Sequence, residues 1–104
     1  MLAPIITNNI NLISTLCQHH KVKELYVFGS AAKNEMNEKS DVDFIVKFNP
    51  EVPVEDYADL YFDFVESLEK LLKRNVDLLT DKPIGNKYLR KDIEETKQIV
   101  YNAA

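Results

Sequence analysis

Two apolar runs stand close together in the first half of the chain: Leu25-Tyr26-Val27-Phe28-Gly29-Ser30 and, after a polar loop, Ser40-Asp41-Val42-Asp43-Phe44-Ile45-Val46. The first run ends in a Gly-Ser turn, and the second opens with two carboxylates one residue apart. Side chains alternate between the faces of a strand, so Asp41 and Asp43 are predicted to point to the same side. Two carboxylates held together repel, and a divalent cation such as Mg²⁺, which prefers oxygen ligands, relieves that repulsion. The pattern therefore predicts a metal-binding strand.

The Gly-Ser turn supplies a complementary feature. Gly29 allows the backbone to turn sharply and to approach a ligand closely. Ser30 is a typical helix N-cap residue, and the unpaired N–H groups at a helix start also attract anions such as phosphate. These two interpretations of Ser30 are compatible, and together with the metal-binding strand they indicate nucleotide chemistry. The competing interpretation is a surface strand whose two acids simply face water.

Composition limits the classes of protein that fit. The chain has 104 residues, enough for one small domain spanning residues 1–104 but not for two. A net charge of −4 argues against non-specific nucleic-acid binding, which needs a basic surface. One cysteine cannot form an internal disulfide, which suits a reducing cytoplasm. The sequence shows neither an apolar stretch of membrane-spanning length nor a secretion signal, so we expect a cytoplasmic protein without a membrane partner.

Hydrophobic periodicity predicts alternating helices and strands, and hence an α/β fold in which helices pack on a small mixed sheet of three or four strands. The run from Leu25 to Phe28 does not alternate, so we expect it to be covered on both faces. A short helix is expected to start the loop 31–39. The other predicted elements are helices over about Pro4–His19, Val54–Lys73 and Asn86–Tyr101, and strands over Asp41–Phe48 and Val76–Thr80.

Two further residues are candidates for the same site. Asp77 interrupts the apolar run Val76–Thr80, where an unpaired carboxylate is costly unless a metal ion or a substrate hydroxyl compensates it. The alternative is an ion pair with a nearby lysine or arginine. Lys33 lies one helical turn past Ser30 and could reach a triphosphate, although a solvated lysine is an equally good interpretation.

These motifs resemble a known signature. Gly29-Ser30, the spacer of residues 31–40 and Asp41-Val42-Asp43 together resemble the motif of the DNA polymerase beta-type nucleotidyltransferase superfamily. The short chain and the segment Val76–Thr80 make it similar to the minimal nucleotidyltransferases (MNT), many of which are antitoxins paired with a HEPN-domain ribonuclease toxin. The family more often has arginine and then glycine where this chain has Lys33-Asn34. Lysine supplies charge there, but not the planar fork of arginine.

The resemblance implies a nucleotidyltransferase fold and a mechanism. Two Mg²⁺ ions would be held by Asp41, Asp43 and Asp77, and the phosphates of ATP by Gly29, Ser30 and Lys33. It further implies AMP transfer from ATP to a tyrosine of a cognate HEPN toxin, which would silence the toxin. Two alternatives remain open: a non-catalytic antitoxin that masks the toxin by binding, and a small-molecule, aminoglycoside-type nucleotidyltransferase whose pocket is built by dimerisation. A homo- or hetero-oligomer fits these alternatives.

Overall fold

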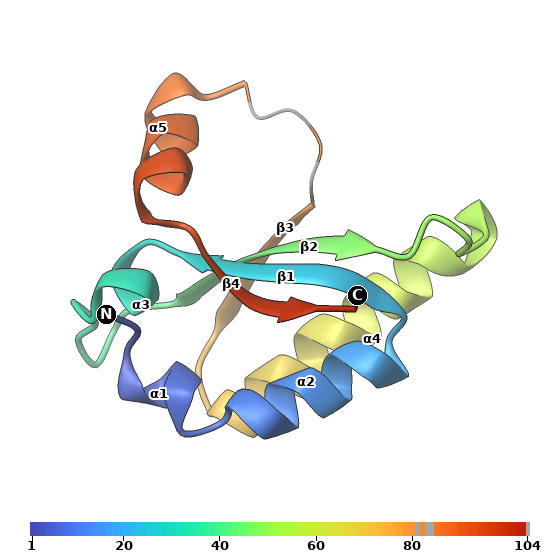
Figure 1. The fold of residues 1–104 in the computed structure, drawn as a ribbon, viewed down its shortest axis with the longest axis horizontal. Helices are drawn as coiled ribbons and strands as arrows, with labels where there is room; N and C mark the ends of the chain where they lie inside the picture. The colour runs from blue at the N-terminus through green and yellow to red at the C-terminus, as the bar shows by residue number, and fades with distance from the viewer. Residues whose placement is uncertain (81, 83–84, 104) are drawn as a thin grey trace.

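The computed structural model describes residues 1–80, 82 and 85–103. These residues form five helices and four strands (Figure 1). In chain order the elements are α1 (Pro4–Thr7), α2 (Ile10–His19), β1 (Val22–Phe28), α3 (Ser30–Lys33), β2 (Val42–Phe48), α4 (Val54–Leu72), β3 (Val76–Thr80), α5 (Lys87–Thr96) and β4 (Gln98–Asn102).

The strands form one mixed sheet in the order β3-β2-β1-β4. β1 runs antiparallel to both β2 and β4, whereas β2 and β3 are parallel. A parallel pair needs a long crossover connection, and α4 provides it. The predicted α/β fold with a small mixed sheet is confirmed.

Helices α2 and α4 lie on one face of the sheet, and the core fills the space between (Figure 1). Val42, Phe44 and Val46 of β2 point into this core and are fully buried. Phe64 of α4 is also fully buried, and its ring lies 5.3 Å from the His20 ring and 6.3 Å from the Phe48 ring, measured between centroids. The strict alternation of β2 sends the residues between them, Asp43 included, to the opposite face.

Helix α5 lies on that opposite face, near the end of the sheet where α3 is found (Figure 1). It leads directly into β4, and two side-chain hydrogen bonds hold this part of the chain to the α3 end. Gly29 N–H donates to Thr96 Oγ1 at 2.9 Å, and Gln98 Nε2 donates to the Ala32 carbonyl at 3.0 Å. The open face of the sheet is therefore covered only in part.

Two expectations about secondary structure are wrong. The helix expected over Pro4–His19 is interrupted at Asn8 and Asn9, where Asn9 Nδ2 donates to the Ile5 carbonyl at 2.9 Å. Asparagine side chains offer the backbone such alternatives to helical bonding. The helix expected over Asn86–Tyr101 ends at Thr96, and Gln98–Asn102 forms β4 along β1. The expectation that β1 is covered on both faces holds only at its end, where the consecutive residues Val27 and Phe28 are both buried, whereas Tyr26 is only partly buried.

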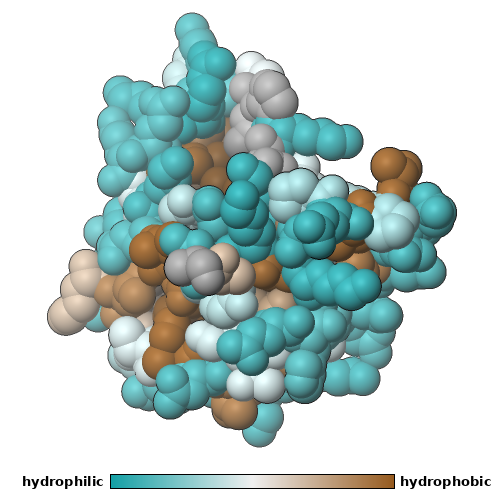
Figure 2. All heavy atoms as spheres, turned by 45° about the vertical axis from the view of Figure 1, so that its right-hand side comes forward, coloured by the Kyte–Doolittle hydropathy of each residue, from teal (hydrophilic) through white to brown (hydrophobic). Residues whose placement is uncertain are grey.

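Hydrophilic residues predominate on the face of the molecule shown in Figure 2. Large exposed apolar side chains come from separate elements, for example Leu12 of α2, Phe62 of α4 and Ile99 of β4. Scattered apolar side chains of this kind are ordinary on protein surfaces. No helix among the described residues combines the length and the apolar character needed to cross a membrane.

Candidate active site

The turn after β1 brings the chain into the candidate site. Gly29 has a φ of 69° and a ψ of −145°, a conformation that side chains rarely permit. Its carbonyl accepts hydrogen bonds from the N–H groups of Ala32 and Lys33, so Gly29 takes the capping position of α3. Ser30 is the first residue of the helix, and no side chain caps it. The sequence predicted the helix start, but it assigned the cap to Ser30 instead of Gly29.

Gly29 also leaves room for the Asp43 carboxylate. A Cβ atom at residue 29 would lie 2.8 Å from Asp43 Oδ2, closer than real Cβ contacts. The contact arises because Phe28, the last residue of β1, pairs with Asp43 of β2. The absence of a side chain at residue 29 therefore allows the Gly-Ser turn and the Asp43 carboxylate to lie together, as the sequence predicted.

Asp77 lies next to Asp43 on the neighbouring strand. The two residues are partners in the parallel register of β2 and β3. Paired residues on adjacent strands project to the same face, about 5 Å apart at the backbone. Asp41 is exposed and immediately precedes β2. The predicted placement of Asp77 on the same side of the sheet as Asp43 is confirmed.

The clustered carboxylates change the protonation of Asp43. Its pKa is raised from the ordinary 3.8 to about 6, first because burial disfavours the charged form and then because the negative charges of Asp77, Asp41 and Asp92 add to the effect. Asp92 is a residue of α5 that the sequence analysis did not single out. Asp92 lies one helical turn before Thr96, so both residues are on one side of α5. This spacing is the sequence feature that could have linked Asp92 to the site.

The chemical type of these side chains fits a hard divalent cation. Carboxylate oxygens are the ligands that Mg²⁺ prefers, and a bound cation would offset both the burial and the repulsion that raise the pKa of Asp43. Within the described ranges, however, no group of three or more Asp, Glu, His or Cys side chains is arranged closely enough to hold a metal ion. Asp41, Asp43 and Asp77 therefore remain candidate ligands whose side chains need to turn toward one another.

Two of the predicted phosphate ligands, Gly29 and Lys33, have protein partners in this structure. Gly29 N–H donates to Thr96 Oγ1, and the Thr96 hydroxyl donates in turn to the Asp92 carbonyl at 2.6 Å. Lys33 Nζ lies 3.6 Å from a Glu35 carboxylate oxygen. A triphosphate would have to share or replace these contacts, so phosphate binding by Gly29, Ser30 and Lys33 stays a prediction. Asn34 adopts the left-handed conformation (φ 59°) that its side chain tolerates.

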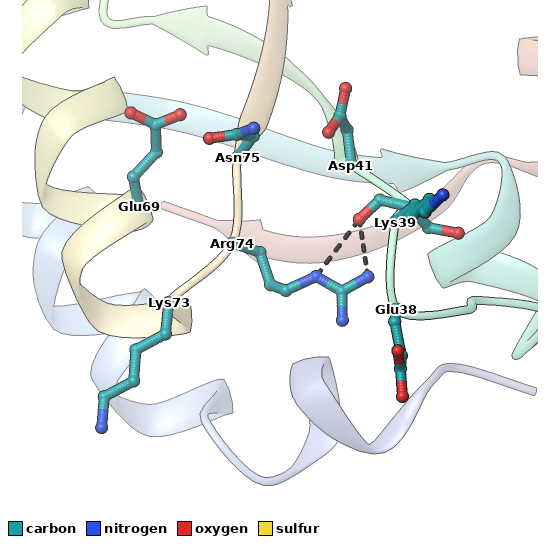
Figure 3. Close-up of a pocket in the computed structure, with 8 residues that line it drawn as sticks. Glu38, Lys39, Asp41, Glu69, Lys73, Arg74 and Asn75 are labelled. Carbon is teal, nitrogen blue, oxygen red and sulfur yellow. Dashed lines mark hydrogen bonds between the residues drawn. The ribbon is translucent and has the colours of Figure 1, made fainter.

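A polar pocket of about 420 Å³ opens beside Asp41, between the loop before β2 and the loop before β3 (Figure 3). Its wall combines both signs of charge, from Glu38, Lys39, Ser40, Asp41, Glu69, Lys73, Arg74 and Asn75. Lys73 and Arg74 were not predicted to belong to the site. Their contacts depend on how the loop before β2 meets the loop before β3.

Comparison with known proteins agrees with this geometry. A family model described as "Nucleotidyltransferase domain" matches residues 10–100. The chain belongs to the nucleotidyltransferase family. Among curated proteins, this nucleotidyltransferase is similar to two proteins of Methanocaldococcus jannaschii, each named "Putative protein adenylyltransferase". One is 43% identical over 76 residues, covering 73% of this chain and 74% of the relative. The other is 44% identical over 80 residues, covering 77% of this chain and 78% of the relative.

Solved structures show the same fold. A structure described as a "putative minimal nucleotidyltransferase" is 28% identical, with a TM-score of 0.68 over 94% of this chain and 95% of the other. A toxin–antitoxin complex with AMP-PNP is 20% identical, with a TM-score of 0.68 over 91% of this chain and 74% of the other. A complex of a tri-AMPylated Shewanella oneidensis HEPN toxin with an MNT antitoxin is 18% identical, with a TM-score of 0.62 over 93% and 72%. This nucleotidyltransferase therefore has the fold of MNT antitoxins.

Proposed function

We propose that this nucleotidyltransferase transfers AMP from ATP to a tyrosine of a HEPN-domain toxin and so neutralises the toxin. The observation that carries the proposal is the placement of Asp43 and Asp77 side by side on parallel strands, against the Gly29 turn. The names of the curated relatives support protein adenylylation. The MNT complexes among the similar folds support a HEPN toxin as the acceptor.

In the proposed reaction, Asp41, Asp43 and Asp77 would hold two Mg²⁺ ions. When bound, such ions stabilise the charge that develops on the entering and leaving oxygens. The Gly29 turn and Ser30 orient the β and γ phosphates, with Lys33 adding positive charge. The tyrosine oxygen bonds to the α phosphorus as the bond to the bridging oxygen breaks, and pyrophosphate leaves. Asp77 receives the proton of the tyrosine hydroxyl.

The protein's own contribution is positioning. β2 and β3 hold the backbones of Asp43 and Asp77 at neighbouring places, and the missing side chain at Gly29 lets the turn that we propose to bind phosphate lie against Asp43. Fixed groups of this kind stabilise a transition state because they need not reorganise during the reaction. The reaction therefore depends on side chains that separate strands bring together.

The test uses the purified chain, the protein encoded by the adjacent reading frame, MgCl₂ and ATP labelled at the α phosphate. We expect label on a tyrosine of the partner. ATP labelled at the γ phosphate should leave the partner unlabelled, which separates adenylylation from phosphorylation. Asp43→Asn should abolish the label. Absence of α label on a partner that binds the wild-type chain would overturn adenylylation.

Two observations favour a second candidate function, masking of the toxin by binding alone. The N–H of Gly29 already has a side-chain acceptor in Thr96, and the carboxylates are not drawn together as a metal site. Masking predicts that Asp43→Asn binds and inhibits the toxin as well as the wild-type chain does. Adenylylation predicts that the same variant leaves the toxin active, because no modified tyrosine is formed.

A further inference from the structure

Arg74 stands between the two loops that lead into the carboxylate-bearing strands. It follows Lys73, the residue that ends α4 in a left-handed conformation with a φ of 57°. Its guanidinium reaches across to the turn before β2, which precedes Asp41 (Figure 3). Asp77 lies three residues after Arg74 in the chain. Arg74 is therefore attached to one acidic strand and bonded to the approach of the other.

The guanidinium makes three hydrogen bonds to this turn. Arg74 Nε donates to the Ser40 carbonyl at 3.2 Å, and Nη2 donates to the same carbonyl at 2.6 Å. Nη2 also donates to the Asn37 carbonyl at 2.6 Å. Hydrogen bonds from a charged donor are roughly twice as strong as neutral ones. These three hydrogen bonds all go to backbone carbonyls, and the salt bridges among the described residues do not include Arg74.

The turn itself has its own internal bonds. Asn37 N–H donates to Ser40 Oγ at 2.9 Å, and Lys39 N–H donates to Asn37 Oδ1 at 2.8 Å. Directly after Asp41, Val42 N–H donates to the Asn75 carbonyl at 2.9 Å. Asp41 is thus fixed on both sides: Arg74 binds the carbonyl of the residue before it, and Asn75 binds the amide of the residue after it.

We propose that Arg74 is a positioning residue that sets the place of Asp41 relative to Asp77 by fixing the Asn37–Ser40 turn. The inference rests on the proposed function, in which these carboxylates bind the catalytic cation. Groups that orient metal ligands from behind typically change metal affinity by about 10–100-fold when they are removed. A lysine at residue 74 keeps the charge, but it lacks the planar fork that reaches two carbonyls at once.

The experiment compares the wild-type chain with Arg74→Ala, Arg74→Lys and Lys73→Asn. Lys73→Asn is the matched control, because it removes a neighbouring charge from the same pocket and asparagine tolerates the left-handed backbone. The first measurement is amide hydrogen exchange without metal. We expect faster exchange at Ser40 and Val42 in both Arg74 variants, with unchanged exchange at core amides such as Val46.

The second measurement is the affinity for Mn²⁺ in the presence of ATP, with electron paramagnetic resonance as the readout. We expect affinity to fall by about tenfold or more in both Arg74 variants, and to stay at the wild-type value in Lys73→Asn. If Arg74→Ala does not fold, Arg74→Lys carries the test. If exchange in the Arg74 variants is unchanged, or if it is faster while Mn²⁺ affinity is unchanged, only the role of Arg74 is overturned and the proposed function stands. A wild-type chain that binds no Mn²⁺ would overturn the proposed metal site and this inference with it.

Discussion

Among the carboxyl groups of the described residues, that of Asp43 has the largest change in pKa. Burial and three neighbouring carboxylates raise its pKa to about 6. At neutral pH the group is still mainly ionised, so the folded protein keeps a charge that its surroundings disfavour. Functional sites often contain such destabilising charges, because a ligand that compensates them binds more tightly.

Replacing Asp43 by Asn should stabilise the metal-free protein at neutral pH. The folded pKa is raised, so the unfavourable contribution of Asp43 is absent below the ordinary 3.8 and grows as the pH rises to about 6. After discounting for the partial exposure of this carboxyl, we expect a gain of about 1–2 kcal/mol in the free energy of unfolding.

Urea unfolding with a chelator present measures this effect at neutral pH and again near the ordinary pKa of Asp43, where the difference should vanish. Added MgCl₂ should stabilise the wild-type chain and leave Asp43→Asn unchanged. A variant that is less stable than wild type at neutral pH would show that Asp43 makes a favourable contact instead.

Gly29→Ala should damage both the turn and the carboxylate site. The backbone at residue 29 has a φ of 69°, and the new Cβ would lie 2.8 Å from Asp43 Oδ2. We expect a loss of about 1–3 kcal/mol in stability, which thermal unfolding measures, and loss of nucleotide transfer as Asp43 is displaced. Gly85→Ala is the control, since nothing lies within 4 Å of its added Cβ. Equal effects of the two substitutions would contradict this account.

At the scale of elements, α5 is joined to the turn before α3 by a hydrogen bond. Its Thr96 hydroxyl accepts from Gly29 N–H and donates to the Asp92 carbonyl, so one side chain joins the end of α5 to the start of α3. The helix begins with a good cap, since Asn86 Oδ1 accepts from the N–H groups of Tyr88 and Leu89. α5 is thus defined at one end by a local cap and at the other by a tertiary contact.

Thr96→Val keeps the shape of the side chain and removes the acceptor for Gly29 N–H. We expect the free energy of unfolding to fall by about 0.5–1.5 kcal/mol, the usual net value of one hydrogen bond. Amide exchange at Gly29 should become faster. Thr96→Ser retains the hydroxyl and should restore slow exchange at Gly29. Slow exchange in the valine variant would mean that the contact with Thr96 does not protect the turn.

At the scale of the whole molecule, the core lies on one face of the sheet and the candidate site on the other. Leu25 and Val27 of β1 and the buried side chains of β2 belong to one core cluster with residues of α2 and α4, and the fully buried Phe64 is part of it. The opposite face holds Asp43 and Asp77, and it is only partly covered by α5 (Figure 1). A stable layer beneath the sheet allows the other face to hold repelling charges.

Two substitutions on α4 separate the core from the surface. Phe64→Ala leaves a cavity in the fully buried core and should cost about 3–5 kcal/mol in stability. Phe62→Ala lies two residues earlier, where the side chain is 67% exposed and contacts the Tyr61 ring, and it should cost less than about 1 kcal/mol. Chemical denaturation measures both, and similar losses would contradict the placement of the core.

Much of the site follows from local sequence. Alternation along β2 puts Asp43 on the face away from Val42 and Phe44. The apolar residues around Asp77 predict a strand, and Asp77 is the acidic residue within it. The break at Asn8 and Asn9 was also readable, because asparagine competes with helical bonding, but the apolar spacing on both sides obscured it.

The sequence by itself determined the strand faces, the Gly-Ser turn and the pair of carboxylates, because these depend on side-chain period and on the backbone freedom of glycine. Only the tertiary structure decided that Gln98–Asn102 forms a strand instead of continuing α5, that Thr96 binds Gly29, and that Arg74 holds the turn before Asp41. These contacts join segments far apart in the chain, and a strand beside a sheet edge gains its hydrogen bonds from its neighbour. The neighbouring strand cannot be predicted from the residues of Gln98–Asn102 themselves.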